Sequence, residues 1–188
     1  MPILDHFGLM APIYDKLIPP VFSERLPELA ALPVNGALLD AGGGTGRVAG
    51  GLTGLASPVV VADVSAGMLR QARRKAGLGA TQACSEQLPF AEASFERVIM
   101  VDALHHVYSQ AATAGELWRV LKPGGRIVIE ELDVRTLPVK LVALAEKLAL
   151  MRSHFLSPPR IAALFHYPNA QVRTVEEGLN SWVIVDKI

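Results

Sequence analysis

Residues 38–50 of the chain are LLDAGGGTGRVAG, and this stretch decides the fold class. The apolar run that ends at Asp40 predicts a buried strand, and five glycines follow it within residues 42–50. A backbone needs glycine where φ is positive or where a ligand approaches closely. Such a turn, between a strand and a predicted helix, presents free backbone N–H groups above the end of a sheet. The stretch therefore predicts a ligand site at the carboxyl edge of a parallel sheet.

A second acidic residue lies at the end of the next predicted strand. Asp63 follows Asp40 by 23 residues and closes the apolar run Val59–Asp63. A carboxylate at that place can accept hydrogen bonds from both hydroxyls of a ribose. The glycine-rich turn and Asp63 together predict a site for a nucleoside-containing cofactor.

The residue at position 47 indicates which kind of nucleotide site this turn could form. A dinucleotide-binding fingerprint, G-x-G-x-x-G, requires a third glycine where this chain has Arg47, which disfavours a nicotinamide oxidoreductase. A P-loop requires Lys followed by Ser or Thr, and Arg47 and Val48 do not supply them. What remains is an acidic residue followed by alternating glycines: Asp40, Gly42, Gly44 and Gly46.

Short apolar runs alternate with helical patterns from residue 35 onward, as is typical of βαβ units in a parallel sheet. Strands are predicted at residues 37–40, 59–63, 97–101 and 126–130. Helices are predicted at residues 66–76, with Ser65 as N-cap, and at 109–121, 137–151 and 159–166. Residues 171–175 and 181–187 predict a closing antiparallel hairpin. We therefore expect an α/β fold with a mostly parallel sheet and helices on both faces.

The composition excludes several classes of protein. Lys plus Arg (18) balances Asp plus Glu (18), so the formal net charge is zero, and 51% of the residues are hydrophobic. That apolar content argues against a disordered chain, and the missing basic excess argues against a nucleic-acid partner. The one cysteine, Cys84, excludes an internal disulfide framework and a cysteine-rich metal site.

No targeting or membrane-spanning segment is expected, which favours a cytoplasmic location without stable membrane insertion. Residues 1–22 are apolar, but they lack a basic start and carry Asp5, Asp15 and Lys16. The closest candidate for a membrane span, residues 137–151, is interrupted by charged residues and falls short of the ~18 apolar residues that a spanning helix needs.

The acidic residue and its alternating glycines resemble the first motif of the class I S-adenosylmethionine-dependent methyltransferases. Later motifs of that family are resembled, in order, by VVVADVSAGMLRQAR at 59–73, SEQLPFAEASFERVIMVDALHHV at 85–107 and ELWRVLKPGGRIVIEELD at 116–133. The resemblance covers roughly residues 38–133 and is to the small-molecule branch, methyltransferase type 11, with its quinone-biosynthesis enzymes. It implies a Rossmann-like fold, S-adenosyl-L-methionine as cofactor and S-adenosyl-L-homocysteine as product.

The resemblance also implies which residues contact the cofactor. From the methionine part through the ribose to the adenine, these are Asp40, Gly42, Gly44, Gly46, Asp63, Val64 and Met68. Asp102, directly after the strand 97–101, is implied near the amino group and the reacting methyl. FGLMAPIYDKL at residues 7–17 resembles an element of quinone-pathway methyltransferases in which Tyr14 would fold over the cofactor as part of a lid. The alternative is that Tyr14 is a packing residue on a cover helix.

Cys84 departs from the family pattern. The family usually has an Asp here, which receives the exocyclic amine of the adenine, and a thiol is a much weaker acceptor. Ser85 can still contact the adenine through its backbone and hydroxyl. We therefore expect weaker cofactor binding than in a Cys84→Asp variant. The alternative is that Cys84 is a small buried residue without a ligand contact.

Candidates for a general base follow the strand 97–101. Methyl transfer from a sulfonium needs a base only if the acceptor must lose a proton, and His105 and His106 lie where the resemblance places the methyl. Adjacent histidines do not both face one site and do not form a metal clip, so one of them is the candidate base and no metal site is expected. The alternative is that the histidine here is structural or simply lines the pocket. Further candidates, for which a surface or packing role is the simpler interpretation, are Glu130, Glu131, His154 and His166.

The whole chain, residues 1–188, is expected to form one methyltransferase domain. Residues 1–34 would be a helical cover or lid, 35–133 the cofactor-binding core, and 169–188 the hairpin. Residues 134–168 lie where such folds usually form the acceptor pocket.

The apolar side chains of that predicted pocket segment favour a small hydrophobic acceptor that is quinone-, phenol- or lipid-like. The alternative for these side chains is that they cover the sheet or form the face of a homodimer. The expected function is methyl transfer to such an acceptor. The alternative function is a cofactor-binding regulatory or scaffold protein without catalysis.

Overall fold

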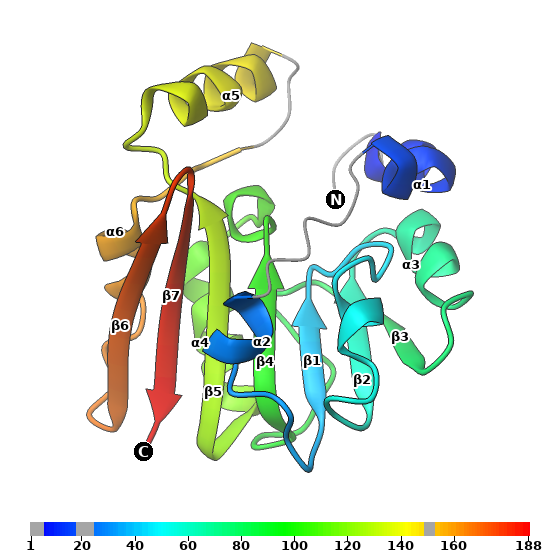
Figure 1. The fold of residues 1–188 in the computed structure, drawn as a ribbon, viewed down its shortest axis with the longest axis vertical. Helices are drawn as coiled ribbons and strands as arrows, with labels where there is room; N and C mark the ends of the chain where they lie inside the picture. The colour runs from blue at the N-terminus through cyan, green and yellow to red at the C-terminus, as the bar shows by residue number, and fades with distance from the viewer. Residues whose placement is uncertain (1–5, 18–24, 149–152) are drawn as a thin grey trace.

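The computed structural model describes residues 6–17, 25–148 and 153–188, and within them the strands form one seven-stranded sheet (Figure 1). The strands are β1 (Leu38–Ala41), β2 (Val59–Asp63), β3 (Leu78–Gln82), β4 (Phe95–Val101), β5 (Leu121–Leu132), β6 (Ala170–Glu177) and β7 (Asn180–Lys187). Their order across the sheet is β3-β2-β1-β4-β5-β7-β6. The first five are parallel, and β7 pairs antiparallel with both β5 and β6. The predicted α/β fold with a closing hairpin is confirmed.

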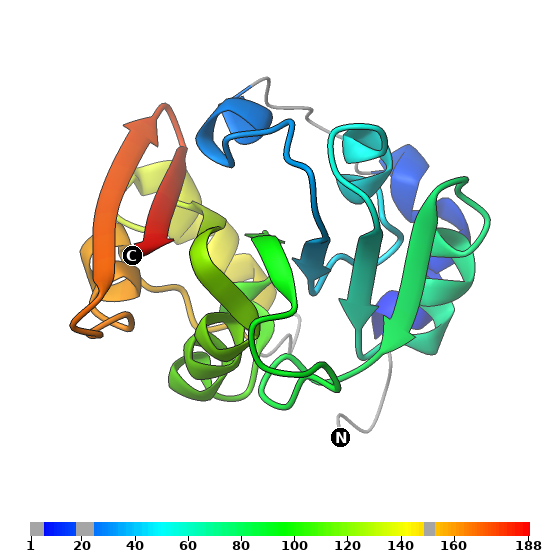
Figure 2. The ribbon, with the colours of Figure 1, turned by 90° about the horizontal axis from the view of Figure 1, so that it is seen from below.

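Helices cover both faces of the sheet (Figure 2). One face carries α2 (Arg25–Leu29), the 3-10 helix η1 (Ala49–Leu52) and α3 (Ala66–Ala72), and the other carries α4 (Gln110–Val120) and α6 (Pro158–Ala162). Successive residues of a strand point to opposite faces of the sheet. Ile99 therefore packs in the core on the α3 side, whereas Val98 and Met100 pack in the core on the α4 side. This double coverage explains why the strands are nearly continuous apolar runs.

Two helices lie beyond the carboxyl ends of the parallel strands (Figure 1). Helix α1 (His6–Leu17) lies against α3, and α5 (Leu137–Leu148) follows β5. A Cβ built on Gly67 of α3 would lie 2.6 Å from the Cα of Gly8 in α1, so the two helices cross at glycines. In the part of the chain that the structure describes, no helix is long and apolar enough to span a membrane.

Several local predictions differ from the structure. The helix predicted directly after the glycine turn is wrong: residues 42–48 form turns, and only η1 follows them. Glycine has low helix propensity, and η1 itself contains Gly50 and Gly51. Strand β3 was not predicted, because its half-exposed sequence LGATQ lies at the sheet edge and has no apolar run.

Other element boundaries shift by a few residues. Residues 122–125, predicted as a turn, form a bulge within β5. Strand β5 pairs with β4 at Leu121 and again from Arg126 onward. Helices α3 and α6 end four residues before their predicted ends. Helix α4 begins at Gln110, one residue later than predicted, because Ser109 is its N-cap and its side chain accepts from the amide of Ala112. The predicted end of the helix at 137–151 lies outside the described residues.

Candidate functional site

The glycine turn lies at the point where the strand order reverses, between β1 and β4. Loops from neighbouring strands diverge at such a point and leave a crevice at the carboxyl edge. Gly42, Gly44 and Gly46 have φ values of 71°, 56° and 69°, a region that L-residues rarely adopt. A Cβ on Gly42 would lie 2.7 Å from the Cβ of Ala103 after β4. The turn therefore requires glycine for its conformation and for its packing.

Asp63 ties the end of β2 to the glycine turn. One carboxylate oxygen accepts from the amide of Gly44 at 2.9 Å, and the other accepts from the amide of Ser65 at 2.8 Å. A Cβ on Gly44 would lie 3.9 Å from Asp63 and 4.0 Å from the sulfur of Met68. Asp63 and Met68 thus lie within van der Waals reach of a side chain at position 44, and Val64 next to Asp63 is half exposed.

Asp40 lies beneath the turn, near the backbone amide of Ala49. Its side chain is buried, and neither carboxylate oxygen has a partner among the described residues. The carboxylate fills the space directly under Gly43, where a Cβ would lie 2.4 Å from Oδ2. Burial, together with the nearby charge of Asp63, raises the pKa of Asp40 from 3.8 to about 7. An unpartnered acid at the base of the turn is a site for a ligand cation, a ligand donor or bound water.

This pKa makes the stability of the free protein depend on pH. Asp40 titrates near 3.8 in the unfolded chain and at about 7 in the folded protein, so the folded state binds the proton more tightly. The stabilisation is fully present below about pH 4 and is lost by about pH 7, a change of about 4 kcal/mol. We expect the free energy of unfolding, measured by urea titration, to fall less over this range in Asp40→Asn than in the parent. Equal slopes for the two proteins would contradict this assignment.

Arg47 connects the turn to the loop after β4. Its guanidinium lies 3.2 Å from the carboxylate of Asp102, which has a positive φ of 50°. Tyr14 of α1 lies near both: burial raises the pKa of Tyr14, and the charge of Arg47 opposes that rise. Burial also raises the pKa of Asp102. The nearby charge of Glu131 adds to this rise, and the charge of Arg47 opposes it. The structure therefore brings Tyr14, Arg47 and Asp102 together at the carboxyl edge of the sheet.

Helix α1 is held to the turn by a polar cluster. The carboxylate of Asp15 accepts from the hydroxyl of Thr45 and from the ammonium of Lys75, the latter at 2.7 Å. Lys75 also donates to the carbonyl of Thr45 at 2.6 Å. With the Gly8–Gly67 crossing, these contacts place Tyr14 near Arg47, Asp102 and Asp63 at the carboxyl edge of the sheet.

Cys84 is exposed, so the alternative that made it a small buried residue is wrong. Its thiol donates to a carboxylate oxygen of Glu86 at 3.0 Å, and this bond is the largest cause of the raised pKa of Cys84. The other oxygen of Glu86 accepts from the amides of Tyr108 and Ser109. Ser85, by contrast, is buried.

The two adjacent histidines have different environments. His105 is buried, its Nδ1 lies 2.5 Å from Glu131, and its ring stacks on Phe155 with centroids 4.1 Å apart. Glu131 also accepts from the amides of Leu104 and His105, at 2.7 and 3.3 Å. His106 is partly exposed, and its Nδ1 lies 3.4 Å from the hydroxyl of Ser153.

Of the remaining candidate acids and bases, Glu130 lies near the Arg47–Asp102 pair, and the backbone amide of Asp102 donates to its carbonyl. Glu130 is buried, and burial raises its pKa. His154 is exposed and contacts the site only through its backbone, with its amide donating to the carbonyl of His105. The described residues contain no group of three or more ligands that could hold a metal ion.

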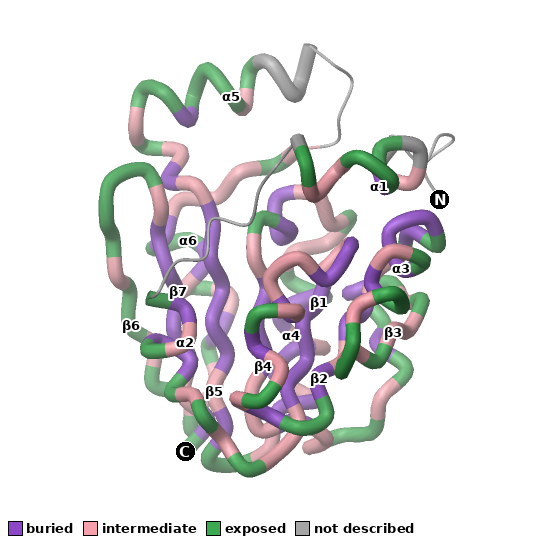
Figure 3. The backbone as a smooth tube through the Cα atoms, turned by 45° about the vertical axis from the view of Figure 1, so that its right-hand side comes forward, coloured by how far each residue is buried: buried purple, intermediate pink, exposed green. Residues whose placement is uncertain are grey.

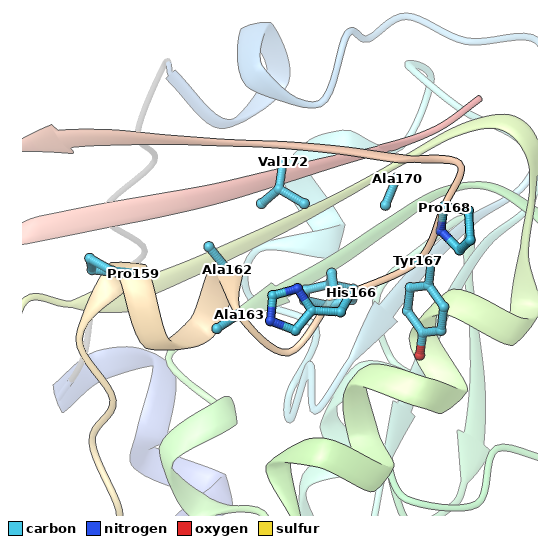
Figure 4. A pocket seen from close by; sticks show the side chains of 9 residues that line it. Pro159, Ala162, Ala163, His166, Tyr167, Pro168, Ala170 and Val172 are labelled. Atoms are coloured by element: carbon cyan, nitrogen blue, oxygen red, sulfur yellow. The ribbon is translucent and has the colours of Figure 1, made fainter.

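A cavity of about 630 Å³ lies between α6 and β6 (Figure 4). His166 and Tyr167 line it, together with small apolar side chains. It reaches the start of β6, where Ala170 pairs with Lys187 at the amino edge of the sheet. This cavity is therefore remote from the glycine turn, and His166 is not part of the candidate site.

Comparison with known proteins identifies the family. A family model described as a methyltransferase domain matches residues 39–129, which contain the glycine turn, Asp63 and Asp102. The chain belongs to the class I S-adenosylmethionine-dependent methyltransferases. A crystal structure of such a methyltransferase from Thermotoga maritima, described as a possible histamine N-methyltransferase, matches 97% of this chain and 100% of its own with a TM-score of 0.74. Its sequence is only 19% identical, so this likeness shows the fold.

Two curated relatives of the chain have names from quinone biosynthesis. The demethylmenaquinone methyltransferase of Clavibacter sepedonicus is 37% identical over 177 residues, covering 89% of this chain and 66% of the relative. The ubiquinone/menaquinone biosynthesis C-methyltransferase UbiE of Coxiella burnetii is 38% identical over 116 residues, covering 56% of this chain and 46% of the relative. The chain thus spans between about half and two thirds of the length of these relatives.

Residues at the carboxyl edge fit S-adenosylmethionine, the cofactor of the family. Asp63 offers carboxylate oxygens beside Gly44 of the glycine turn, Met68 lies next to it, and two carboxylate oxygens of Asp40 lie below the turn without a partner among the described residues. These features fit a ligand with ribose hydroxyls and a cationic amino acid end. Sequence reasoning missed Asp15, Thr45 and Lys75, and considered Arg47 only to exclude other cofactors.

Proposed function

We propose that this chain transfers the methyl group of S-adenosylmethionine to a small apolar acceptor of the quinone, phenol or lipid class. The observation that carries the acceptor class is the similarity to a demethylmenaquinone methyltransferase, which extends over 89% of this chain and beyond the cofactor core. The near-neutral composition supports a small molecule over a nucleic acid as the acceptor.

Each side of the crevice would hold a different part of the cofactor. Asp63 would accept from the ribose hydroxyls, and Met68, Val64 and Ser85 would border the adenine. The turn formed by Gly42, Gly44 and Gly46 would border the methionine part, and Asp40 and Asp102 would face its amino end. Tyr14 would close the crevice from α1. The bound cofactor supplies the electrophilic methyl, so the chain has to align the acceptor and exclude water.

His106 is the better candidate for a general base where the acceptor must lose a proton. The Nδ1 of His105 lies 2.5 Å from Glu131 and Phe155 covers its ring, whereas the ring of His106 stays partly exposed. His105 would then hold the loop after β4 in place, and His106 would meet the acceptor.

The proposed activity is tested by incorporation of labelled methyl from S-adenosylmethionine into naphthoquinols, phenols and fatty acids. We expect transfer to a quinol or phenol, and loss of that transfer in Asp63→Ala. Binding of S-adenosylhomocysteine without transfer to any acceptor would favour the regulatory or scaffold alternative. Absence of binding would overturn the assignment of the cofactor site.

A Cys84→Asp variant is expected to bind S-adenosylmethionine several-fold more tightly than the parent. The introduced carboxylate would accept from the adenine amine more strongly than the thiol does, although Glu86, only 3.0 Å from the thiol, opposes a second charge. Cys84→Ser is the matched control, because it keeps a small neutral side chain. Calorimetric titration measures the affinities, and equal or tighter binding by the parent would refute the prediction.

A further inference from the structure

The chain returns to the candidate site after α5. Of the described side chains of α5, only that of Val139 is buried, and Figure 3 shows this helix as mostly exposed. Contacts of α5 with the rest of the chain therefore do little to fix the residues that follow it. The position of residues 153–155, which we call the return segment, depends mainly on the contacts that these residues make themselves.

The return segment contacts both candidate histidines of the loop after β4. The amide of His154 donates to the carbonyl of His105 at 2.7 Å, and the ring of Phe155 stacks on the ring of His105. The hydroxyl of Ser153 lies 3.4 Å from the Nδ1 of His106, the proposed base. A shift of the return segment would therefore change the surroundings of His106.

Gln110 joins the return segment to this loop. Its side-chain nitrogen Nε2 donates to the carbonyl of His154 at 2.7 Å. The same nitrogen donates at 3.2 Å to the carbonyl of Leu104, which begins the 3-10 helix η2 (Leu104–His106). A side-chain amide carries two hydrogens on one nitrogen, so it can serve two carbonyls at once. Gln110 is the first residue of α4 and follows the N-cap Ser109, so the helix fixes its backbone.

The contacts of Gln110 lie on the acceptor side of the proposed site. Both of its acceptors belong to the loop that carries His106 or to the return segment. The residues proposed to hold the cofactor lie on the glycine turn, on β2 and α3, and at Asp102. Loss of the amide of Gln110 should therefore affect the acceptor more than the cofactor.

We propose that Gln110 is a positioning residue for methyl transfer, because its amide fixes the return segment against the loop that carries His106. This role rests on the proposed function, in which His106 meets the acceptor. The return segment forms one wall of the acceptor site, and the two hydrogen bonds of Gln110 set the place of that wall relative to His106.

Hydrogen exchange of the His154 amide, followed by NMR in the free protein, tests the contact itself. We expect about tenfold faster exchange in Gln110→Ala, because the return segment loses the donor to its carbonyl. Gln110→Glu keeps the length of the side chain but cannot donate when ionised, so its exchange should be equally fast. Gln110→Lys should exchange much as the parent does, because an ammonium can donate to two carbonyls, as Lys187 does to those of Trp118 and Leu121.

Steady-state kinetics with an acceptor found by labelled methyl incorporation test the positioning role. We expect kcat/KM for the acceptor to fall about tenfold or more in Gln110→Ala and Gln110→Glu, and to recover in Gln110→Lys. The Kd of S-adenosylhomocysteine, from calorimetric titration, should stay within about twofold of the parent value in all three variants. The control is Gln171→Ala, which removes an exposed glutamine of β6 at the opposite edge of the sheet and should leave all three measurements unchanged.

Four results would overturn the proposal. These are parent-like exchange of His154 in Gln110→Ala, an unchanged kcat/KM in that variant, a Gln110→Lys variant as impaired as Gln110→Ala, or a loss of cofactor affinity as large as the loss of kcat/KM. The exchange measurement needs neither cofactor nor acceptor, so it separates this proposal from the proposed function. A parent protein that methylates no acceptor would defeat the proposed function and this role with it, whereas parent-like exchange in Gln110→Ala would defeat the role of Gln110 alone.

Discussion

Asp63→Ala is expected to weaken the binding of S-adenosylhomocysteine by about 100-fold or more, as measured by calorimetric titration. In the proposed complex, the carboxylate accepts two charge-assisted hydrogen bonds from the ribose, each contributing about 1.5 kcal/mol or more. The same carboxylate orients the amides of Gly44 and Ser65, so its loss also loosens the turn. Both effects reduce affinity.

Two variants make this result interpretable. Asp63→Asn keeps one carbonyl acceptor and should bind with intermediate affinity, because only the charge and one acceptor are lost. Glu92→Ala removes an exposed carboxylate away from the carboxyl edge and should bind as the parent does. Circular dichroism and thermal melting establish that each variant is folded. An affinity of folded Asp63→Ala within about threefold of the parent would place the ribose elsewhere.

Glu131→Ala is expected to produce the largest loss of stability. The buried carboxylate accepts from the amides of Leu104 and His105 and contacts the ring of His105 at 2.5 Å. Its removal leaves these buried donors without an acceptor, at a cost of about 3–5 kcal/mol. The melting temperature should fall by about 6–20 °C, given ~2–4 °C per kcal/mol for a chain of this size.

The matched control for this variant is Glu176→Ala. Glu176 is an exposed glutamate that pairs with Arg135 at 2.6 Å, and exposed pairs contribute little to stability. Glu131→Gln retains one oxygen for the two backbone amides and should lose less stability than Glu131→Ala. A Glu131→Ala variant as stable as Glu176→Ala would show that the loop after β4 does not depend on this carboxylate.

The sequence predicted those elements whose signal is local. Strand β2 matches its predicted bounds, because Val59–Asp63 is a continuous apolar run that ends in an acid. The turn at Gly42, Gly44 and Gly46 was predictable because only glycine readily takes the positive φ found there. Strand β3 was missed because an edge strand that is half exposed needs no apolar run.

The interactions around the crevice were not predictable in the same way. Arg47 and Asp102 are 55 residues apart in sequence, and Asp15 and Lys75 are 60 apart. Such pairs depend on which loops the strand order of the sheet brings together. The sequence around either residue does not indicate which distant residue it will contact. The choice between His105 and His106 likewise required the position of Glu131 on β5.

The sequence alone determined the fold class, the glycine turn with Asp63, and the family. Residue type determines backbone conformation and strand burial within short segments, so both can be predicted from the sequence pattern. Only the tertiary structure decided that Asp40 is buried without a partner among the described residues, that Glu131 holds His105, and that Leu137, Leu141 and Leu144 of α5 are exposed. Burial and pairing are properties of the packed chain, because they depend on which distant segments exclude water from each side chain.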